Sequence, residues 1–197
     1  MTHTPLRPLI LASTSVYRRQ LLTRLRLAFT VMASDVDETP QPEETPEHLA
    51  RRLALAKANS VARLHPGAVV IGSDQVADLD GQPLGKPGTH ARAVAQLQTM
   101  RDKTVVFQTA VAVVCLESGF AQTELAQIKV KFRPLSDAQI EAYLLAEQPY
   151  DCAGSAKSEG LGIALLEHID NDDPTALVGL PLIRTCSLLE AAGVRVL

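Results

Sequence analysis

The feature that most limits the fold is a pair of long segments rich in β-branched residues in the middle of the chain. These segments, residues 104–115 and 121–132, are separated by Glu117, Ser118 and Gly119. Two such segments joined by a short polar turn are typical of an antiparallel β-hairpin. The fold is therefore expected to contain long antiparallel strands.

Strand-like and helix-like segments alternate on both sides of this hairpin. Short apolar runs predict strands at residues 9–12, 29–33, 68–72 and 163–166. Helical periodicity predicts helices at 16–26, 47–64, 89–100 and 181–192, and a capping box predicts one from Ser136 to just before Pro149. The sequence thus predicts an α/β protein with a mixed twisted sheet, helices on its faces and two lobes around a central cleft. We expect residues 1–197 to form a single domain.

The composition excludes several classes of protein. The formal net charge of −3 and the seven aromatic residues, none of them Trp, argue against a nucleic-acid partner. No run approaches 18 apolar residues, so neither membrane spanning nor export is expected. Three widely spaced cysteines are typical of reduced thiols in a cytoplasmic protein.

Two cations, Arg18 and Lys57, stand where the helical pattern is otherwise apolar. Ser13, Thr14 and Ser15 lead into a helix on which Arg18 shares the apolar face, and such a helix start stabilises an anion. A serine cap with Arg18 paired to a carboxylate is the alternative. Lys57 lies within an apolar helical stripe of Leu49, Leu53, Val61 and Leu64, where it either snorkels to solvent or points into a cleft.

Acidic residues provide candidate metal or proton-accepting groups. Asp74 follows a buried strand, where it either binds a cation or accepts a proton, or simply begins a turn. Glu38 ends an acidic cluster that is suited to magnesium completed by substrate phosphates. Asp170 to Asp173 are interpreted as a solvated turn. Lys86 sits in a Gly-Lys-Pro turn that differs in spacing from a P-loop.

Together these segments resemble the Maf family of nucleoside triphosphate pyrophosphatases, and within it the YceF subgroup, which acts on 7-methyl-GTP. Seven signatures carry the resemblance in order from about residue 8 to 190: Leu9 to Ser15 with Arg18 and Arg19, Asp37-Glu38-Thr39, Lys57-Ala58, Gly72 to Gln75, Gly85-Lys86-Pro87, Cys152 to Gly162, and Val178 to Leu182.

The resemblance implies hydrolysis of a nucleoside triphosphate to the monophosphate and pyrophosphate with a divalent cation, Mg²⁺ or Mn²⁺. It makes Asp74 the proton acceptor, with Lys57 and Lys86 as further catalytic residues. The phosphates would be bound by Ser13, Ser15, Arg18 and Arg19, and the metal by Glu38 and Asp74. Cations placed around a triphosphate stabilise the charge on the leaving pyrophosphate.

Three positions that distinguish subgroups in this family correspond to Tyr17, Gln75 and Glu159. Methylation makes the guanine ring a cation, which an aromatic ring such as Tyr17 can stack on. A carboxylate such as Glu159 can accept hydrogen bonds from the base. The alternatives are a pyrophosphatase for dTTP, UTP or another noncanonical triphosphate, and a nucleotide-binding regulator of septum formation. The expected partner is a small-molecule nucleotide; a homodimer is left open.

Overall fold

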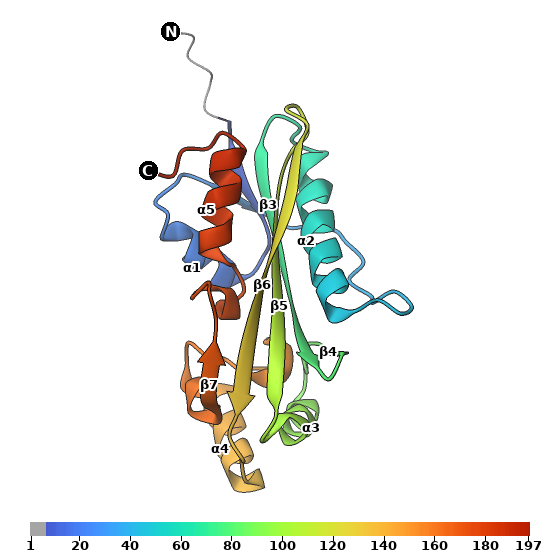
Figure 1. Ribbon diagram of the computed structural model, residues 1–197, viewed down its shortest axis with the longest axis vertical. Helices are drawn as coiled ribbons and strands as arrows, with labels where there is room; N and C mark the ends of the chain where they lie inside the picture. The colour runs from blue at the N-terminus through green and yellow to red at the C-terminus, as the bar shows by residue number, and fades with distance from the viewer. Residues whose placement is uncertain (1–6) are drawn as a thin grey trace.

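A single mixed sheet organises the structure, a computed structural model that describes residues 7–197; the first six residues of the predicted domain lie outside this range. Seven strands form the sheet in the order β2-β1-β3-β5-β6-β7, and β4 pairs with β3 (Figure 1). The strands are β1 (Leu9–Ala12), β2 (Thr30–Met32), β3 (Val69–Leu79), β4 (Gln82–Leu84), β5 (Thr104–Cys115), β6 (Phe120–Phe132) and β7 (Leu166–Asp170).

The predicted hairpin is confirmed as β5 and β6. The two strands pair antiparallel without interruption from Thr104 opposite Lys131 to Cys115 opposite Phe120. On its other side β5 pairs with β3, so these three long strands form the centre of the sheet. The parallel pairs β1–β2 and β1–β3 then make the sheet mixed, as the sequence predicts.

The helices cover both faces of this sheet. Helix α2 packs on one face, while α1 and α5 lie on the other (Figure 1). Each of the first four α-helices begins with a Ser or Thr cap, because that hydroxyl satisfies an otherwise unpaired backbone N–H. The helices are α1 (Val16–Thr23), α2 (Pro46–Ala62), α3 (His90–Met100), α4 (Asp137–Glu147) and α5 (Leu182–Ala191), with 3-10 helices η1 (Ala153–Ser155), η2 (Leu161–Leu165) and η3 (Ala176–Val178).

A buried polar stretch separates two apolar cores on the α1/α5 face. One core joins Val69 and Ile71 of β3 to α1 and α5, and the other joins Ala77 and Leu79 to α3 and α4. Side chains alternate between the faces of a strand, so the residues between these pairs on the same face are Ser73 and Gln75. The three central strands therefore extend through both lobes.

The cleft between the lobes follows from how β3 is paired. At its outer edge, residues 69–71 pair with β1 and residues 77–79 pair with β4. Between these ladders, residues 72–76 have no strand partner at that edge within residues 7–197. The loop after β1 borders this gap on one side and the turn after β4 on the other, so both are close to the unpaired edge.

Several predicted boundaries are wrong in an informative way. The strand predicted at 68–72 continues to Leu79, so Asp74 lies inside it rather than at its carboxyl end. The segment predicted as a strand at 163–166 is mostly η2, and β7 follows it at Leu166. Helix α2 ends at Ala62, so Leu64 lies beyond the predicted stripe and is 70% exposed.

No helix among residues 7–197 has the length and apolar character to cross a membrane.

Candidate active site

A cavity of about 810 Å³ occupies the cleft at the unpaired edge of β3. Its walls come from the β1–α1 loop, α2, β3, the turn after β4, and the two segments 151–159 and 177–179. The predicted site residues that line it are Ser13, Ser15, Tyr17, Arg18, Glu38, Lys57, Gln75, Lys86 and Glu159. The structure therefore gathers residues spread over nearly 150 positions of the chain into one cavity.

Two predicted site residues lie outside this lining. Arg19 is exposed on α1, where its helix turns it away from the cavity. Asp74 is only 7% exposed and is reached through Lys57, which does line the cavity. Asp74 is thus a buried carboxylate one side chain removed from the open space.

The start of α1 combines a helix cap with a free guanidinium. Ser15 is the cap and its Oγ accepts from the backbone N–H of Arg18 at 3.4 Å, so of the alternative interpretation the serine cap is confirmed and the pairing of Arg18 is wrong. Arg18 is not paired to a carboxylate, because its Nε donates to the carbonyl oxygen of Gly179 at 2.8 Å. No other partner of this side chain occurs in the described part of the chain, which leaves both Nη groups for a ligand.

A buried lysine joins two carboxylates at the centre of the site. Lys57 Nζ lies 2.6 Å from Asp74 Oδ1 and 2.6 Å from Glu38 Oε1. The side chains of Lys57 and Asp74 are 8% and 10% exposed, whereas that of Glu38 is 58% exposed. Lys57 therefore does not snorkel to solvent; its ammonium is held inside the cleft by opposite charge.

Burial and neighbouring charge act differently on the two carboxyl groups. Burial raises the pKa of Asp74 above its ordinary value, although the charges of Lys57 and Arg18 oppose this. Burial also acts to raise the pKa of Glu38, but the hydrogen bond and charge of Lys57, with the charges of Lys86 and Arg18, lower it. A raised pKa in a carboxylate suits it to accept a proton.

Gly72 allows α2 to approach β3 closely enough for Lys57 to reach Asp74. A Cβ at this position would lie 2.2 Å from the Ala54 carbonyl oxygen and 2.6 Å from the Ala58 nitrogen. Both atoms belong to the backbone of α2, so no side-chain rotation could relieve the overlap. The absence of a side chain two residues before Asp74 thus sets the position of Lys57.

The polar residues beside Asp74 hold a turn on the opposite face of β3. Gln75 Nε2 donates to Thr109 Oγ1 at 2.9 Å and to the carbonyl oxygens of Ala176 and Leu177 at 3.0 Å. Ser73 Oγ donates to the carbonyl oxygen of Gly179 at 3.0 Å, the atom that also binds Arg18. Sequence reasoning assigned no role to Ser73 and Thr109, because the hydrogen bonds that join them to the turn at 176–179 span 106 and 67 positions of the chain.

One part of the cavity lining, named here its acidic end, contains an aromatic ring and two carboxylates. Tyr17 is half-buried, and Lys157 Nζ lies 5.9 Å from the centre of its ring. Lys157 is itself neutralised by Glu147 at 2.7 Å, whereas Asp151 and Glu159 have no cationic partner among the described residues. Burial, with the charge of Asp151, raises the pKa of the Cys152 thiol to about 12. This end of the cavity is therefore negatively charged.

The carboxylates fit a divalent cation only together with oxygen atoms from a substrate. Within residues 7–197, no cluster of three or more His, Cys, Asp or Glu side chains is placed to hold a metal. Glu38 Oε1 and Asp74 Oδ1 both contact Lys57 Nζ, and among the described residues the second oxygen of each carboxylate has no protein partner. Magnesium is commonly held by one or two carboxylates plus phosphates. The donor set thus matches a cation brought by a triphosphate.

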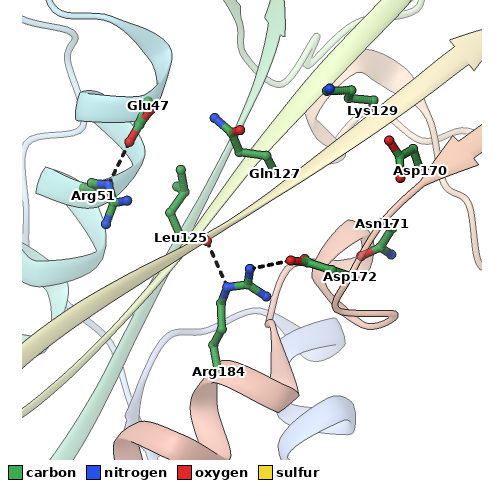
Figure 2. Close-up of a pocket in the computed structure, with 9 residues that line it drawn as sticks. All are labelled: Glu47, Arg51, Leu125, Gln127, Lys129, Asp170, Asn171, Asp172 and Arg184. Carbon is green, nitrogen blue, oxygen red and sulfur yellow. Dashed lines mark hydrogen bonds and ion pairs between the residues drawn. The ribbon is translucent and has the colours of Figure 1, made fainter.

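A second cavity, of about 480 Å³, lies where β7 stops covering β6 (Figure 2). Its charged side chains largely pair with one another: Glu47 with Arg51, and Asp172 with Arg184, which also donates to the Leu125 carbonyl oxygen. The neighbouring Asp173 is fully buried, so the prediction of a solvated turn at 170–173 is wrong for that residue. This self-paired surface is a weaker candidate for a site than the cleft.

The structure is thus an α/β protein with one central cavity whose lining combines the cations Arg18, Lys57 and Lys86 with carboxylates and an aromatic side chain, as expected of a site for a small charged ligand. The family model described as Maf-like protein matches residues 8–192, and the chain belongs to this family.

Relatives match nearly the whole chain. It is 72% identical over 191 residues to the 7-methyl-GTP pyrophosphatase of Albidiferax ferrireducens, covering 97% of this chain and 96% of that one. It is 75% identical over 188 residues to the protein of the same name from Polaromonas sp., covering 95% and 86%. The solved Staphylococcus aureus Ham1 protein is 15% identical with a TM-score of 0.49, covering 65% and 73%.

Proposed function

We propose that this protein hydrolyses 7-methyl-GTP to 7-methyl-GMP and pyrophosphate, and so removes a modified nucleotide. The observation that carries the proposal is the cleft itself, whose lining combines the cations Arg18, Lys86 and Lys57, the last paired with the buried Asp74, with the aromatic ring of Tyr17 and the carboxylates of Asp151 and Glu159. The names of relatives at 72–75% identity give the same activity. Residues 1–197 would act as one domain, in the cytoplasm.

At the cationic end, the protein would bind the triphosphate. The Arg18 Nη groups and Lys86 face the cavity, and Ser13 and Ser15 present hydroxyl groups at the start of α1. A triphosphate carries close to four negative charges, so cations fixed beforehand stabilise it and the leaving pyrophosphate. A divalent cation held by Glu38, Asp74 and phosphate oxygens would supply further charge neutralisation there.

Asp74 would accept the proton of the attacking water. The water oxygen forms a bond to the α-phosphorus while the bond from that phosphorus to the oxygen bridging to the β-phosphate breaks, and pyrophosphate leaves. The proton passes to the Asp74 carboxylate, whose pKa is raised by burial. Lys57 holds this carboxylate in place at 2.6 Å. Arg19, which is exposed, would contribute only long-range charge.

At the acidic end, the protein would recognise the base. N7-methylation gives the guanine ring a positive charge, which matches the carboxylates of Asp151 and Glu159 at the cavity wall. Tyr17 would stack on the ring, and Glu159 would accept hydrogen bonds from its N1–H and amino group. Gln75 would act by fixing the turn at Ala176 and Leu177, because its side-chain nitrogen already donates to their carbonyl groups.

A substrate panel tests the proposal. Pyrophosphate release is measured with magnesium and with manganese for 7-methyl-GTP, GTP, dTTP, UTP and ITP. We expect the highest kcat/KM for 7-methyl-GTP, with GTP at least tenfold lower, because GTP lacks the N7-methyl group and the positive charge that it gives the ring. A preference for dTTP and UTP would overturn the substrate assignment. Tight binding without turnover of any triphosphate would favour a nucleotide-binding regulator.

A further inference from the structure

One side chain outside the cavity connects its two ends. Gln96 lies half-buried on α3, and its Nε2 donates to the carbonyl oxygen of Gly85 at 2.9 Å. Its Oε1 accepts a hydrogen bond from Ser155 Oγ at 2.5 Å. Gly85 directly precedes Lys86, and Ser155 lies within the segment 151–159 that lines the acidic end. A single amide group therefore bridges the turn at Gly85 and Lys86, called the lysine turn below, and the segment 151–159, called the base loop.

Both segments held by Gln96 need such support. The turn at Gly85 and Lys86 is exposed and follows a strand of only three residues, and the chain is buried again only at Pro87. Ser155 is fully buried with a φ of +55°, a left-handed conformation that costs energy for a residue other than glycine. A hydrogen bond to its hydroxyl stabilises this conformation and hence the course of the loop.

The bridge uses both halves of an amide group. The Gly85 carbonyl accepts from the amide nitrogen and the Ser155 hydroxyl donates to the amide oxygen, whereas a Leu side chain of similar size provides neither a donor nor an acceptor. One further link joins the same two segments, from the Gly88 backbone N–H to the Tyr150 carbonyl oxygen at 2.9 Å. That link lies on the far side of Lys86 from Gly85, so Gln96 supplies the second of two attachment points.

We propose that Gln96 is a positioning residue that fixes Lys86 relative to the base loop and thereby couples base recognition to the placement of the phosphates. The inference rests on the proposed function, because it assigns Lys86 to the phosphates and the loop to the base. Gln96 is not part of the cavity lining; it acts through Gly85 on one side and through Ser155 on the other.

Two substitutions separate the two halves of the bridge. Gln96→Glu keeps an acceptor for Ser155 but loses the donor to Gly85, whereas Ser155→Ala removes only the loop side. We expect Gln96→Glu to lower kcat about tenfold on every substrate while the ratio of kcat/KM between 7-methyl-GTP and GTP stays within twofold. Ser155→Ala should instead lower that ratio severalfold and leave kcat within about threefold.

A double-mutant cycle with Lys86→Ala provides the decisive readout. Groups that act through one another are non-additive, so Gln96→Leu should lower kcat about tenfold in the native background and less than twofold when Lys86 is already alanine. Gln98→Leu is the matched control, because Gln98 lies on the same helix and donates only to Asp137 Oδ1 at 3.1 Å. That control should keep native kcat and KM.

Additive effects of Gln96→Leu and Lys86→Ala would overturn the proposal, as would equal losses in Gln96→Leu and Gln98→Leu. If Gln96→Leu does not fold, Gln96→Glu replaces it in the same cycle. The cycle is run with whichever triphosphate the native protein hydrolyses fastest, so a wrong base assignment leaves this test intact. If no triphosphate is hydrolysed, the cycle is measured on the Kd for 7-methyl-GTP and judged by the same additivity.

Discussion

The two ends of the cleft are built from different kinds of structure. At the phosphate end, Arg18, Lys57 and Asp74 stand on α1, α2 and β3, and the last two are almost wholly buried, whereas Lys86 and Glu38 stand in exposed connections. At the base end, Asp151 and Glu159 are exposed on a segment of turns and the short η1 helix. Regular elements hold side chains more precisely than loops do, whereas loops change more freely. We therefore expect the rate of hydrolysis to depend on the phosphate end. The choice of base should depend on the segment that carries Asp151 and Glu159.

The largest effect is expected from Asp74→Asn. The amide keeps the shape of the carboxylate and its contact with Lys57 but cannot accept the proton, so kcat should fall by roughly 10²–10⁴-fold. Isothermal titration should show a nucleotide Kd within several-fold of the native value. Asp78→Asn, four residues along the same strand and outside the cavity lining, should keep native kcat. Retained turnover in Asp74→Asn would remove this residue from the role of base.

The next largest effect is expected from Gly72→Ala, which tests how rigid the phosphate end is. The added methyl group overlaps the backbone of α2, so we expect a loss of about 1–3 kcal/mol in unfolding free energy and a lower kcat, because Lys57 moves away from Asp74. Denaturant unfolding and steady-state kinetics measure both. In the control Gly67→Ala, the methyl group meets only the side-chain carboxyl of Glu117, which can move away. Similar losses in both variants would argue against the close approach at Gly72.

A comparison of Lys86→Ala with Glu159→Gln separates the two ends directly. Losing the lysine should lower kcat/KM by roughly 10–100-fold for every triphosphate, since a hydrogen bond to a charged group contributes about 1.5–3 kcal/mol. Removing the negative charge of Glu159 should reduce the preference for 7-methyl-GTP over GTP severalfold and leave GTP hydrolysis nearly unchanged. If both variants lose the same factor across the panel, the division between the ends is wrong.

The smallest effect is expected for the reactivity of Cys152, which reports the charge of the base end in the protein without substrate. With its pKa raised from the ordinary range to about 12, Cys152 should carry roughly a thousandfold less thiolate at pH 8 than a free cysteine and react slowly with iodoacetamide. Asp151→Asn removes a negative charge that opposes the thiolate, so the pKa should fall and labelling should become severalfold faster. Mass spectrometry in a Cys186→Ser background reports the rate. An unchanged rate would mean that Asp151 does not act on this pocket.

The sequence predicts most of the regular elements because their signals are local. The long hairpin follows from two β-branched runs and a turn, and the Ser136 capping box is present as expected. Lys57 and Arg18 are recognisable as candidates because a charge on an apolar helix face breaks a regular period. These two residues therefore allow the cationic part of the cleft to be predicted from the sequence.

The remaining features depend on contacts between distant parts of the chain. The strand β3 extends past Ser73, Asp74 and Gln75, polar residues that would end an apolar run, because partners in α2 and in the turn at 176–179 satisfy them. Arg18 lies against a carbonyl group rather than the predicted carboxylate because that same turn reaches it. Gln96 has no sequence signal at all, since one polar residue on an exposed helix face is ordinary.

The continuity of the central strands also limits how the protein can move. Many nucleotide enzymes close two lobes about a flexible hinge, but here β3, β5 and β6 pass through both apolar cores as one hydrogen-bonded ladder. A rigid rotation of one lobe would break several of these bonds, so opening and closing is confined to twisting of the sheet and to displacement of the turns at its edge. We therefore expect exchange of nucleotide with solvent to depend on displacement of the cavity-lining segments around Lys86 and residues 151–159.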